Sequence, residues 1–162
     1  MEGFDIRFTE SADLDSLRSW FARPQEREPF PFQTDPETEI SLQGWIGFSK
    51  WRASLTGTFH GVPCALGTLF LMPYRKVAHH CSFTLMVDPA LRRKGIGTSM
   101  VRNLMHLAKS RFRLESLHAE LYLPCHLLPL LHKLGFLELA FQENYLHIGG
   151  TKRPRIILEK TL

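Results

Sequence analysis

The stretch from His80 to Lys109 is HCSFTLMVDPALRRKGIGTSMVRNLMHLAK. Its pattern indicates a strand, a short basic turn that contains glycines, and then a helix. From Cys81 to Asp88, the apolar set Cys81, Phe83, Leu85 and Val87 alternates with Ser82, Thr84, Met86 and Asp88, which predicts a strand whose two faces differ. Asp88-Pro89 ends that strand, because proline supplies no N–H group to a ladder. Apolar residues then recur at helical spacing, which predicts an amphipathic helix over residues 96–109.

The turn between this strand and this helix, Arg92 to Thr98, combines three basic residues with two glycines. The first N–H groups of a helix have no intrahelical partner, and the helix dipole adds partial positive charge there. Glycines let a ligand approach the backbone closely, and Arg and Lys side chains add full charges. The turn is therefore a candidate phosphate- or pyrophosphate-binding site. An ordinary strand-to-helix turn with solvated basic residues would show the same spacing.

Two motifs in the chain resemble those of the GNAT superfamily of N-acetyltransferases. Arg92-Arg93-Lys94-Gly95-Ile96-Gly97 matches the family's pyrophosphate loop, Q/R-x-x-G-x-G/A. Leu85-Met86-Val87-Asp88-Pro89 resembles the end of the family's fourth strand. Leu130 to Phe136 (LLHKLGF) is similar to a second family motif, L-Y-x-K-x-G-F. The motifs occur in the family's order, and the clear match spans roughly residues 80–137.

The remaining elements follow an order that also characterises the GNAT fold. The patterns predict strands at 5–10, 55–60, 64–72, 117–123, 137–148 and 154–158, and helices at 11–21, 37–51 and 126–134. Ser11 is the expected N-cap of the first helix. We therefore expect one α/β domain over residues 1–162, with a mixed, mostly antiparallel sheet flanked by helices.

Composition limits the classes of function. The chain has 162 residues, a formal charge of +4 and three cysteines without a C-x-x-C spacing. The length fits one domain with a proper core, and the charge favours an anionic ligand. The cysteines suit a reducing cytoplasm, and no apolar run is long enough to span a bilayer. We therefore expect a cytoplasmic protein without a membrane segment or a metal site. Nucleic acid is a disfavoured partner, because basic and aromatic residues do not interleave.

The resemblance implies transfer of an acetyl group from acetyl-CoA to a primary amine, a small molecule or a protein amino group, by direct attack in a ternary complex. It implies that backbone N–H groups of the loop hold the pyrophosphate, and that the fourth strand binds the pantetheine arm through its backbone. The implied cofactor-binding residues are Leu85, Met86, Val87, Arg92, Arg93, Lys94, Gly95, Ile96, Gly97 and Thr98. It further implies a homodimer that pairs through late strands.

The implied reaction needs groups that move protons and stabilise charge. An alkylamine is mostly protonated near neutral pH, so a base or a water chain must remove a proton before attack. The thioester oxygen gains negative charge and needs a backbone donor, for which we expect the N–H of Val87 or a neighbour. The candidate bases on the fourth strand are Ser82, Thr84, His79 and His80.

One position departs from the family's pattern. In this family a tyrosine there often protonates the departing thiolate. Aligning Gly135-Phe136 with the second motif places Leu131 there. The candidate substitute acids are Tyr122, Cys125, His126 and His132. Unassisted departure of the thiolate is a second explanation. A non-catalytic acyl-CoA-binding or regulatory domain is the third.

Residues 25–39 are rich in acids and contain one basic residue, Arg27. In the family, the first two helices and their connection line the acceptor site. We therefore hypothesise that Glu26 and Glu28 attract a cationic amine and that Phe30 or Phe32 covers its apolar part. A solvated acidic loop without a binding role is the alternative.

Overall fold

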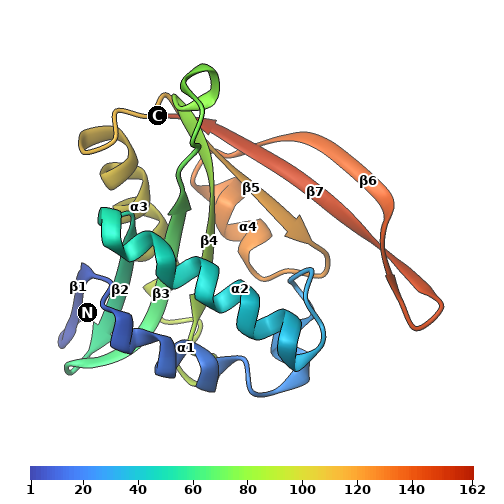
Figure 1. Ribbon diagram of the computed structural model, residues 1–162, viewed down its shortest axis with the longest axis horizontal. Coiled ribbons are helices and arrows are strands. Elements are labelled where there is room, and N and C mark those ends of the chain that lie inside the picture. Colours follow the sequence, from blue (N-terminus) through green and yellow to red (C-terminus); the bar gives the residue numbers. More distant parts are fainter.

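A seven-stranded sheet runs through the computed structural model, which describes residues 1–162 (Figure 1). Its strands are β1 (Phe4–Phe8), β2 (Ser54–Phe59), β3 (Val62–Phe70), β4 (His80–Val87), β5 (Ser116–Tyr122), β6 (Leu137–Ile148) and β7 (Thr151–Thr161). Their order across the sheet is β1-β2-β3-β4-β5-β7-β6, and only β4 and β5 run parallel. The predicted mixed, mostly antiparallel α/β fold is confirmed.

Four helices cover the two faces of this sheet. A first hydrophobic cluster joins α3 (Ile96–Ser110) and α4 (Leu127–Lys133) to one face, through side chains such as Leu104 and Leu131. A second cluster joins α1 (Leu14–Trp20) and α2 (Asp35–Gly47) to the other face, where they meet Leu66 of β3 and Met86 of β4. The sheet therefore has an α3/α4 face and an α1/α2 face, and each strand near its centre is buried on both.

The parallel strands β4 and β5 diverge, and this divergence positions the site (Figure 1). Their pairing covers only His80–Ser82 and Ser116–His118, although β4 continues to Val87 and β5 to Tyr122. β3 pairs with the opposite edge of β4 along this length. The edge of β4 beyond Ser82 therefore borders a gap in the sheet instead of a hydrogen-bonded neighbour.

Two predicted details of the N-terminal half were wrong. Ser11 is not an N-cap, because a 3-10 turn over Ser11–Asp13 precedes α1 and Glu10 caps that turn in a capping box with Asp13. The second helix begins at Asp35 and ends at Gly47, and residues Phe48–Trp51 continue as a 3-10 turn. Glycine lowers helix stability, so the pair of glycines in the last turn favours an early end. No helix of the structure has both the length and the apolar character that crossing a bilayer requires.

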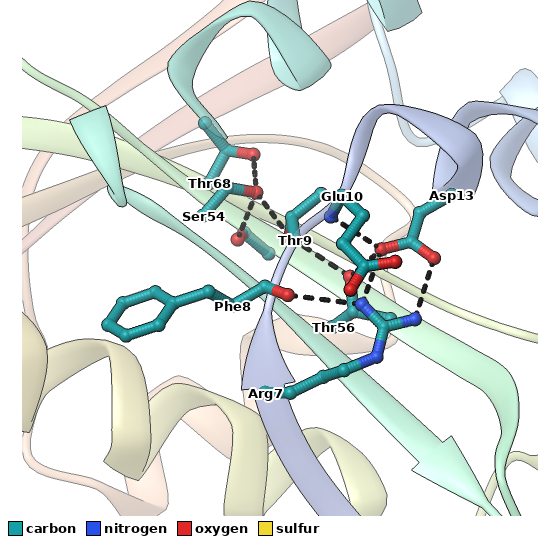
Figure 2. A network of polar contacts seen from close by, with 9 residues as sticks. Arg7, Phe8, Thr9, Glu10, Asp13, Ser54, Thr56 and Thr68 are labelled. Carbon is teal, nitrogen blue, oxygen red and sulfur yellow. Dashed lines mark hydrogen bonds and ion pairs between the residues drawn. The ribbon is translucent and has the colours of Figure 1, made fainter. Parts of the chain in front are cut away.

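A buried carboxylate joins the start of α1 to the sheet (Figure 2). Arg7 donates to both carboxylate oxygens of Asp13 at 2.8 Å, and the Thr56 hydroxyl donates to one of them at 2.9 Å. Burial would raise the pKa of Asp13, but the hydrogen bonds from Arg7, the Glu10 backbone and Thr56 hold it below its ordinary value. Asp13 is therefore a charged group that its partners stabilise inside the fold.

A row of hydroxyl groups continues from this carboxylate beneath α2 (Figure 2). The Thr9 hydroxyl lies 2.9 Å from those of Thr56 and Ser54, and Ser54 lies 2.9 Å from Thr68. The Thr68 hydroxyl then donates to the carbonyl of Trp45 at 3.3 Å. Every hydroxyl in the row has a partner, so burying it costs little. The row connects the end of β1, β2 and β3 to α2, whose Trp45 lines the site described next.

Candidate functional site

The loop between β4 and α3 brings its backbone to the N-terminus of a 15-residue helix. Arg93 and Gly95 both adopt left-handed backbone angles, with φ of 64° and 83°. A Cβ added at Gly95 would meet nothing within 4 Å, so the backbone angle and not the space favours glycine there. The first N–H groups of α3, from Ile96 to Thr98, lack intrahelical acceptors. The loop can therefore surround an anion with backbone donors.

The second sequence motif packs directly against the first. A Cβ at Gly97 would lie 3.1 Å from Leu130 Cδ1 and 3.8 Å from Val87 Cγ2, so the start of α3 approaches α4 and the end of β4 closely. Gly135, at φ 86°, ends α4, and Phe136 then returns its N–H to the Leu131 carbonyl at 3.0 Å. The two motifs therefore form one structural unit on the α3/α4 face.

The basic side chains of the loop divide into two groups. Arg93 and Lys94 are exposed, as a phosphate contact requires. Arg92 turns inward, where its guanidinium donates to Glu26 at 2.6 Å and lies 3.7 Å from the Met86 sulfur. The predicted role of Arg92 in cofactor binding therefore concerns its backbone, because its side chain joins the loop to the segment between α1 and α2.

The backbone of β4 alternates between its two neighbours. The Asp88 N–H donates across to the Cys64 carbonyl at 2.8 Å, toward β3. Successive N–H groups of a strand point to opposite edges. The N–H groups of Val87 and Leu85 therefore point toward the gap that β5 leaves. The family resemblance implies that the pantetheine arm and the thioester oxygen bind along this edge.

A cavity of about 330 Å³ opens at the divergence of β4 and β5, beside the α1/α2 face. Its lining comes from the loop before α2, from α2, and from β3, β4, β5 and the start of α4. The lining residues that carry polar or aromatic side chains are Phe30, Phe32, Ser41, Trp45, Phe70, Ser82, Phe83, Thr84, His118, Glu120, Tyr122 and Cys125. The cavity therefore meets both strands where their pairing has ended.

Three titratable side chains of β5 border this cavity: His118, Glu120 and Tyr122. They occupy alternate positions, and the residues between them, such as Ala119, are buried in the cluster beneath α3. The Tyr122 hydroxyl donates to Glu120 at 2.8 Å, and Arg155 of β7 donates to the other Glu120 oxygen at 2.6 Å. The β5 face therefore carries an imidazole, a carboxylate and a phenol in one row.

The protonation of these groups follows from their surroundings. Burial lowers the pKa of His118, and the neighbouring His80 ring, at a centroid distance of 5.5 Å, lowers it further. Burial raises the pKa of Tyr122, as does its hydrogen bond to Glu120. At neutral pH, His118 is therefore an uncharged proton acceptor and Tyr122 retains its proton.

Six of the predicted side chains come together at the cavity: Ser82, Thr84, Tyr122, Cys125, Phe30 and Phe32. The predicted His79, His80 and His126 do not line it. His126 is exposed at the start of α4, and His132 lies 2.8 Å from Glu138 on the outer side of that helix. Leu131 is completely buried, so the family's tyrosine position faces the core.

The acids of residues 25–39 are already engaged. Glu26 binds Arg92 at 2.6 Å, and Glu28 lies 3.8 Å from Arg153. Asp35 pairs with Arg27, Glu37 caps the start of α2, and Glu39 pairs with Arg18. None of these acids lines the cavity, whose only acid is Glu120 of β5, which itself accepts from Arg155 and Tyr122.

Sequence reasoning missed His118 and Glu120. The signal was present as His118-Ala119-Glu120-Leu121-Tyr122, a strand with polar residues at alternate positions. That alternation predicts one polar face, but it does not reveal that the face borders a cavity. Only the divergence from β4 exposes these side chains to a ligand, and no local pattern encodes it.

Several solved structures are similar to this one, whereas no protein of curated function matches the sequence. Superposition on yncA of Salmonella typhimurium, solved with its cofactor acetyl-CoA, gives a TM-score of 0.83 at 17% identity, covering 99% of this chain and 94% of that one. A GNAT-family acetyltransferase of Streptococcus pneumoniae gives 0.79 at 17%, covering 98% and 99%. The ribosomal-protein-alanine N-acetyltransferase of Brucella melitensis gives 0.81 at 19%, covering 98% and 99%. At these identities the similarity establishes the fold alone.

A family model described as the acetyltransferase (GNAT) family matches residues 14–136. The match includes both helices of the α1/α2 face, the loop before α3 and the motif that ends α4. The predicted family and its acetyl donor, acetyl-CoA, are confirmed. The chain therefore belongs to the GNAT family of acetyl-CoA-dependent acetyltransferases.

Proposed function

We propose that this protein transfers an acetyl group from acetyl-CoA to a primary amine held in the cavity beside β4 and β5. The observation that carries the proposal is the divergence of these strands beyond Ser82 and His118. The loop for the pyrophosphate belongs to the α3/α4 face, and the cavity belongs to the α1/α2 face. A thioester in the gap between the strands would meet an amine arriving from the other side.

The donor is held mainly by backbone in this proposal. The N–H groups from Arg93 to Thr98 bind the pyrophosphate, and Arg93 and Lys94 add exposed positive charge. The pantetheine arm lies along the free edge of β4. The N–H groups of Leu85 and Val87 both point into the gap, and that of Leu85, which is nearer to the cavity, donates to the thioester oxygen as negative charge develops there.

The acceptor nitrogen must lose a proton, and His118 is the base that we assign. Its imidazole lines the cavity, is uncharged at neutral pH, and stands opposite Ser82 at the last paired position of β4 and β5. His118 takes one proton from the ammonium group, and the free amine then attacks the carbonyl carbon, so that a C–N bond forms and the C–S bond breaks. Tyr122, which retains its proton, supplies it to the departing thiolate and recovers a proton from the nitrogen that becomes the amide.

Release of free CoA thiol from acetyl-CoA, followed over time with a panel of primary amines and an acceptor-free blank, tests this function. Acceptor-dependent release is the expected result. A rise in melting temperature with acetyl-CoA but no release with any amine would contradict the activity and favour the non-catalytic acyl-CoA-binding domain. Absence of both effects would contradict the CoA site as well.

A further inference from the structure

The cavity has a rigid aromatic wall. Phe30 and Phe32 stack at a centroid distance of 5.3 Å, and Phe30 lies 5.6 Å from Trp45. All three rings pack on Phe21, which is 1% exposed, at centroid distances of 5.1 to 5.7 Å. Because a buried ring holds them from behind, these side chains form a preformed apolar surface. The wall therefore suits an acceptor with a flat apolar group.

The charged side chain in the cavity lining is negative. None of its 17 residues is Lys or Arg, and Glu120 is its only acid. The cation nearest to Glu120 is Arg155, which is engaged by Glu120 at 2.6 Å and by Gln142, and which stacks on Tyr145 at 3.8 Å. A carboxylate in this cavity would therefore meet no free cation, and desolvating it would go uncompensated.

Arg153 is the rival cation. Its Nη1 is buried without a hydrogen-bond partner, and its Nη2 lies 3.8 Å from Glu28. However, Arg153 lines a separate surface pocket with Pro124 and Pro129 and is absent from the lining of the aromatic cavity. A carboxylate could reach it only by extending past the turn that contains Cys125, which borders both pockets.

From this wall and this charge, we infer that the acceptor is a small arylalkyl primary amine with a single positive charge and no carboxylate. The inference rests on the proposed function and names its substrate class. The aromatic ring lies against Phe30, Phe32 and Trp45, and the amine lies at the β5 row, near His118 and Glu120. The cavity of about 330 Å³ lies at the small end of the range for ligand sites and has room for an arylalkyl amine of this size.

Phenethylamine and phenylalanine form a matched pair of acceptors, because they share the ring and the chain and differ by one carboxylate. Compared at equal concentrations of unprotonated amine, phenethylamine should give a kcat/KM at least about 30-fold higher. It should also exceed butylamine about tenfold, because butylamine lacks the ring. A higher kcat/KM for phenylalanine, for spermidine or for a peptide with an N-terminal alanine would overturn the inference.

A pair of variants tests whether the charge of Glu120 sets this preference. Glu120→Gln leaves Arg155 without a carboxylate, so the phenethylamine-to-phenylalanine ratio should fall about tenfold. Glu138→Gln, on β6, where the wild-type side chain pairs with His132 of α4, should leave the ratio unchanged. A ratio that Glu120→Gln does not alter would overturn the inference, as would a preference for phenylalanine that Arg153→Gln abolishes.

Binding measured without turnover separates this inference from the proposed function. Titration of phenethylamine and of phenylalanine into the complex of the protein with free CoA forms a dead-end complex, which calorimetry detects. Tighter binding of phenethylamine supports the acceptor class even if no amine releases thiol from acetyl-CoA, in which case only the proposed activity is overturned. Equal or tighter binding of phenylalanine overturns the acceptor class even if turnover occurs.

Discussion

On the donor side of the sheet, the binding groups that we propose come from one continuous loop, Arg92 to Thr98, and most of them are backbone N–H groups. On the acceptor side, the cavity is lined by side chains that lie between Pro29 and Leu127 in the sequence. The donor site therefore depends on a few local backbone angles, and the acceptor site depends on how distant elements pack. This difference explains how a family can keep one donor while its members take different acceptors.

The two sides are not independent. The ion pair between Glu26 and Arg92 joins the segment after α1 to the first residue of the donor loop, at 2.6 Å. The Glu26 side chain is 13% exposed and that of Arg92 is 28% exposed, so water screens the pair only in part. The comparison between the sides can therefore be tested by three kinds of variant. They change one side, the hydrogen-bond network around Asp13, or the ion pair between Glu26 and Arg92.

The largest effect is expected on the acceptor side, from His118→Ala. Loss of the base should lower kcat about 100-fold and leave the KM for acetyl-CoA within about twofold. His106→Ala, on the exposed side of α3, is the matched control and should change neither. Steady-state kinetics in both substrates measures the effect, and a loss of less than about threefold would remove His118 from the mechanism.

The pH profile of the wild type should carry the same signature. The pKa of His118 lies below its ordinary value of 6.5 because of burial and His80, while Glu159 and Glu120 oppose the shift. The base is therefore free at pH 7, and kcat/KM should fall only as the pH drops through the lowered pKa. In His118→Ala this acidic limb should disappear; its persistence would point to another base.

The next largest effect is expected from Asp13→Asn, in the hydrogen-bond network beneath the acceptor side. Removing the charge that Arg7 and Thr56 bind should lower the free energy of unfolding by about 2 kcal/mol, as measured by urea denaturation. The folded pKa of Asp13 is lowered, so this stability is present above the ordinary value of 3.8 and is lost as the pH falls through the lowered pKa. Asp15→Asn, at a side chain that is 85% exposed, should cost less than about 0.5 kcal/mol. Equal costs for the two variants would contradict the role of the network.

The donor side should be most sensitive to Gly95→Val. Valine resists φ of 83°, so the loop should change its backbone and the KM for acetyl-CoA should rise about tenfold. Gly150→Val is matched in backbone, with φ of 81° and open space around a Cβ, but it lies in the β6–β7 turn. It should cost similar stability without changing this KM. If both variants weakened acetyl-CoA equally, the loop would not be the pyrophosphate site.

The smallest effect is expected from the connection between the sides. Glu26→Gln should loosen the segment that carries Phe30 and Phe32 and raise the acceptor KM about threefold. Glu28→Gln, whose wild-type side chain is 52% exposed and 3.8 Å from Arg153, should leave that KM unchanged. An equal rise in both variants would support the hypothesis that these acids attract the amine by charge alone.

The donor side and the order of the elements could be predicted from the sequence. The turn residues Gly95 and Gly97, the helical periodicity after them and the motif ending at Phe136 each depend on neighbours within a few positions. Local backbone preferences therefore carry their own signal, and the fold built on them was confirmed. The arginine contacts of Glu26 and Glu28 could not be predicted from local patterns, because these arginines lie 66 and 125 positions away along the chain.

By itself, the sequence indicated the family through its two motifs. It also determined the sheet-and-helix order and the glycine-containing turn that we propose for the donor phosphates, since these follow from periodicity and from glycine's access to positive φ. Only the tertiary structure decided which polar residues meet at the acceptor cavity. Ser82 and His118 are 36 positions apart, and they become neighbours because β4 and β5 pair for three residues and then separate. Where strands part is set by the packing of helices on both faces, a balance of many distant contacts that no single stretch of sequence contains.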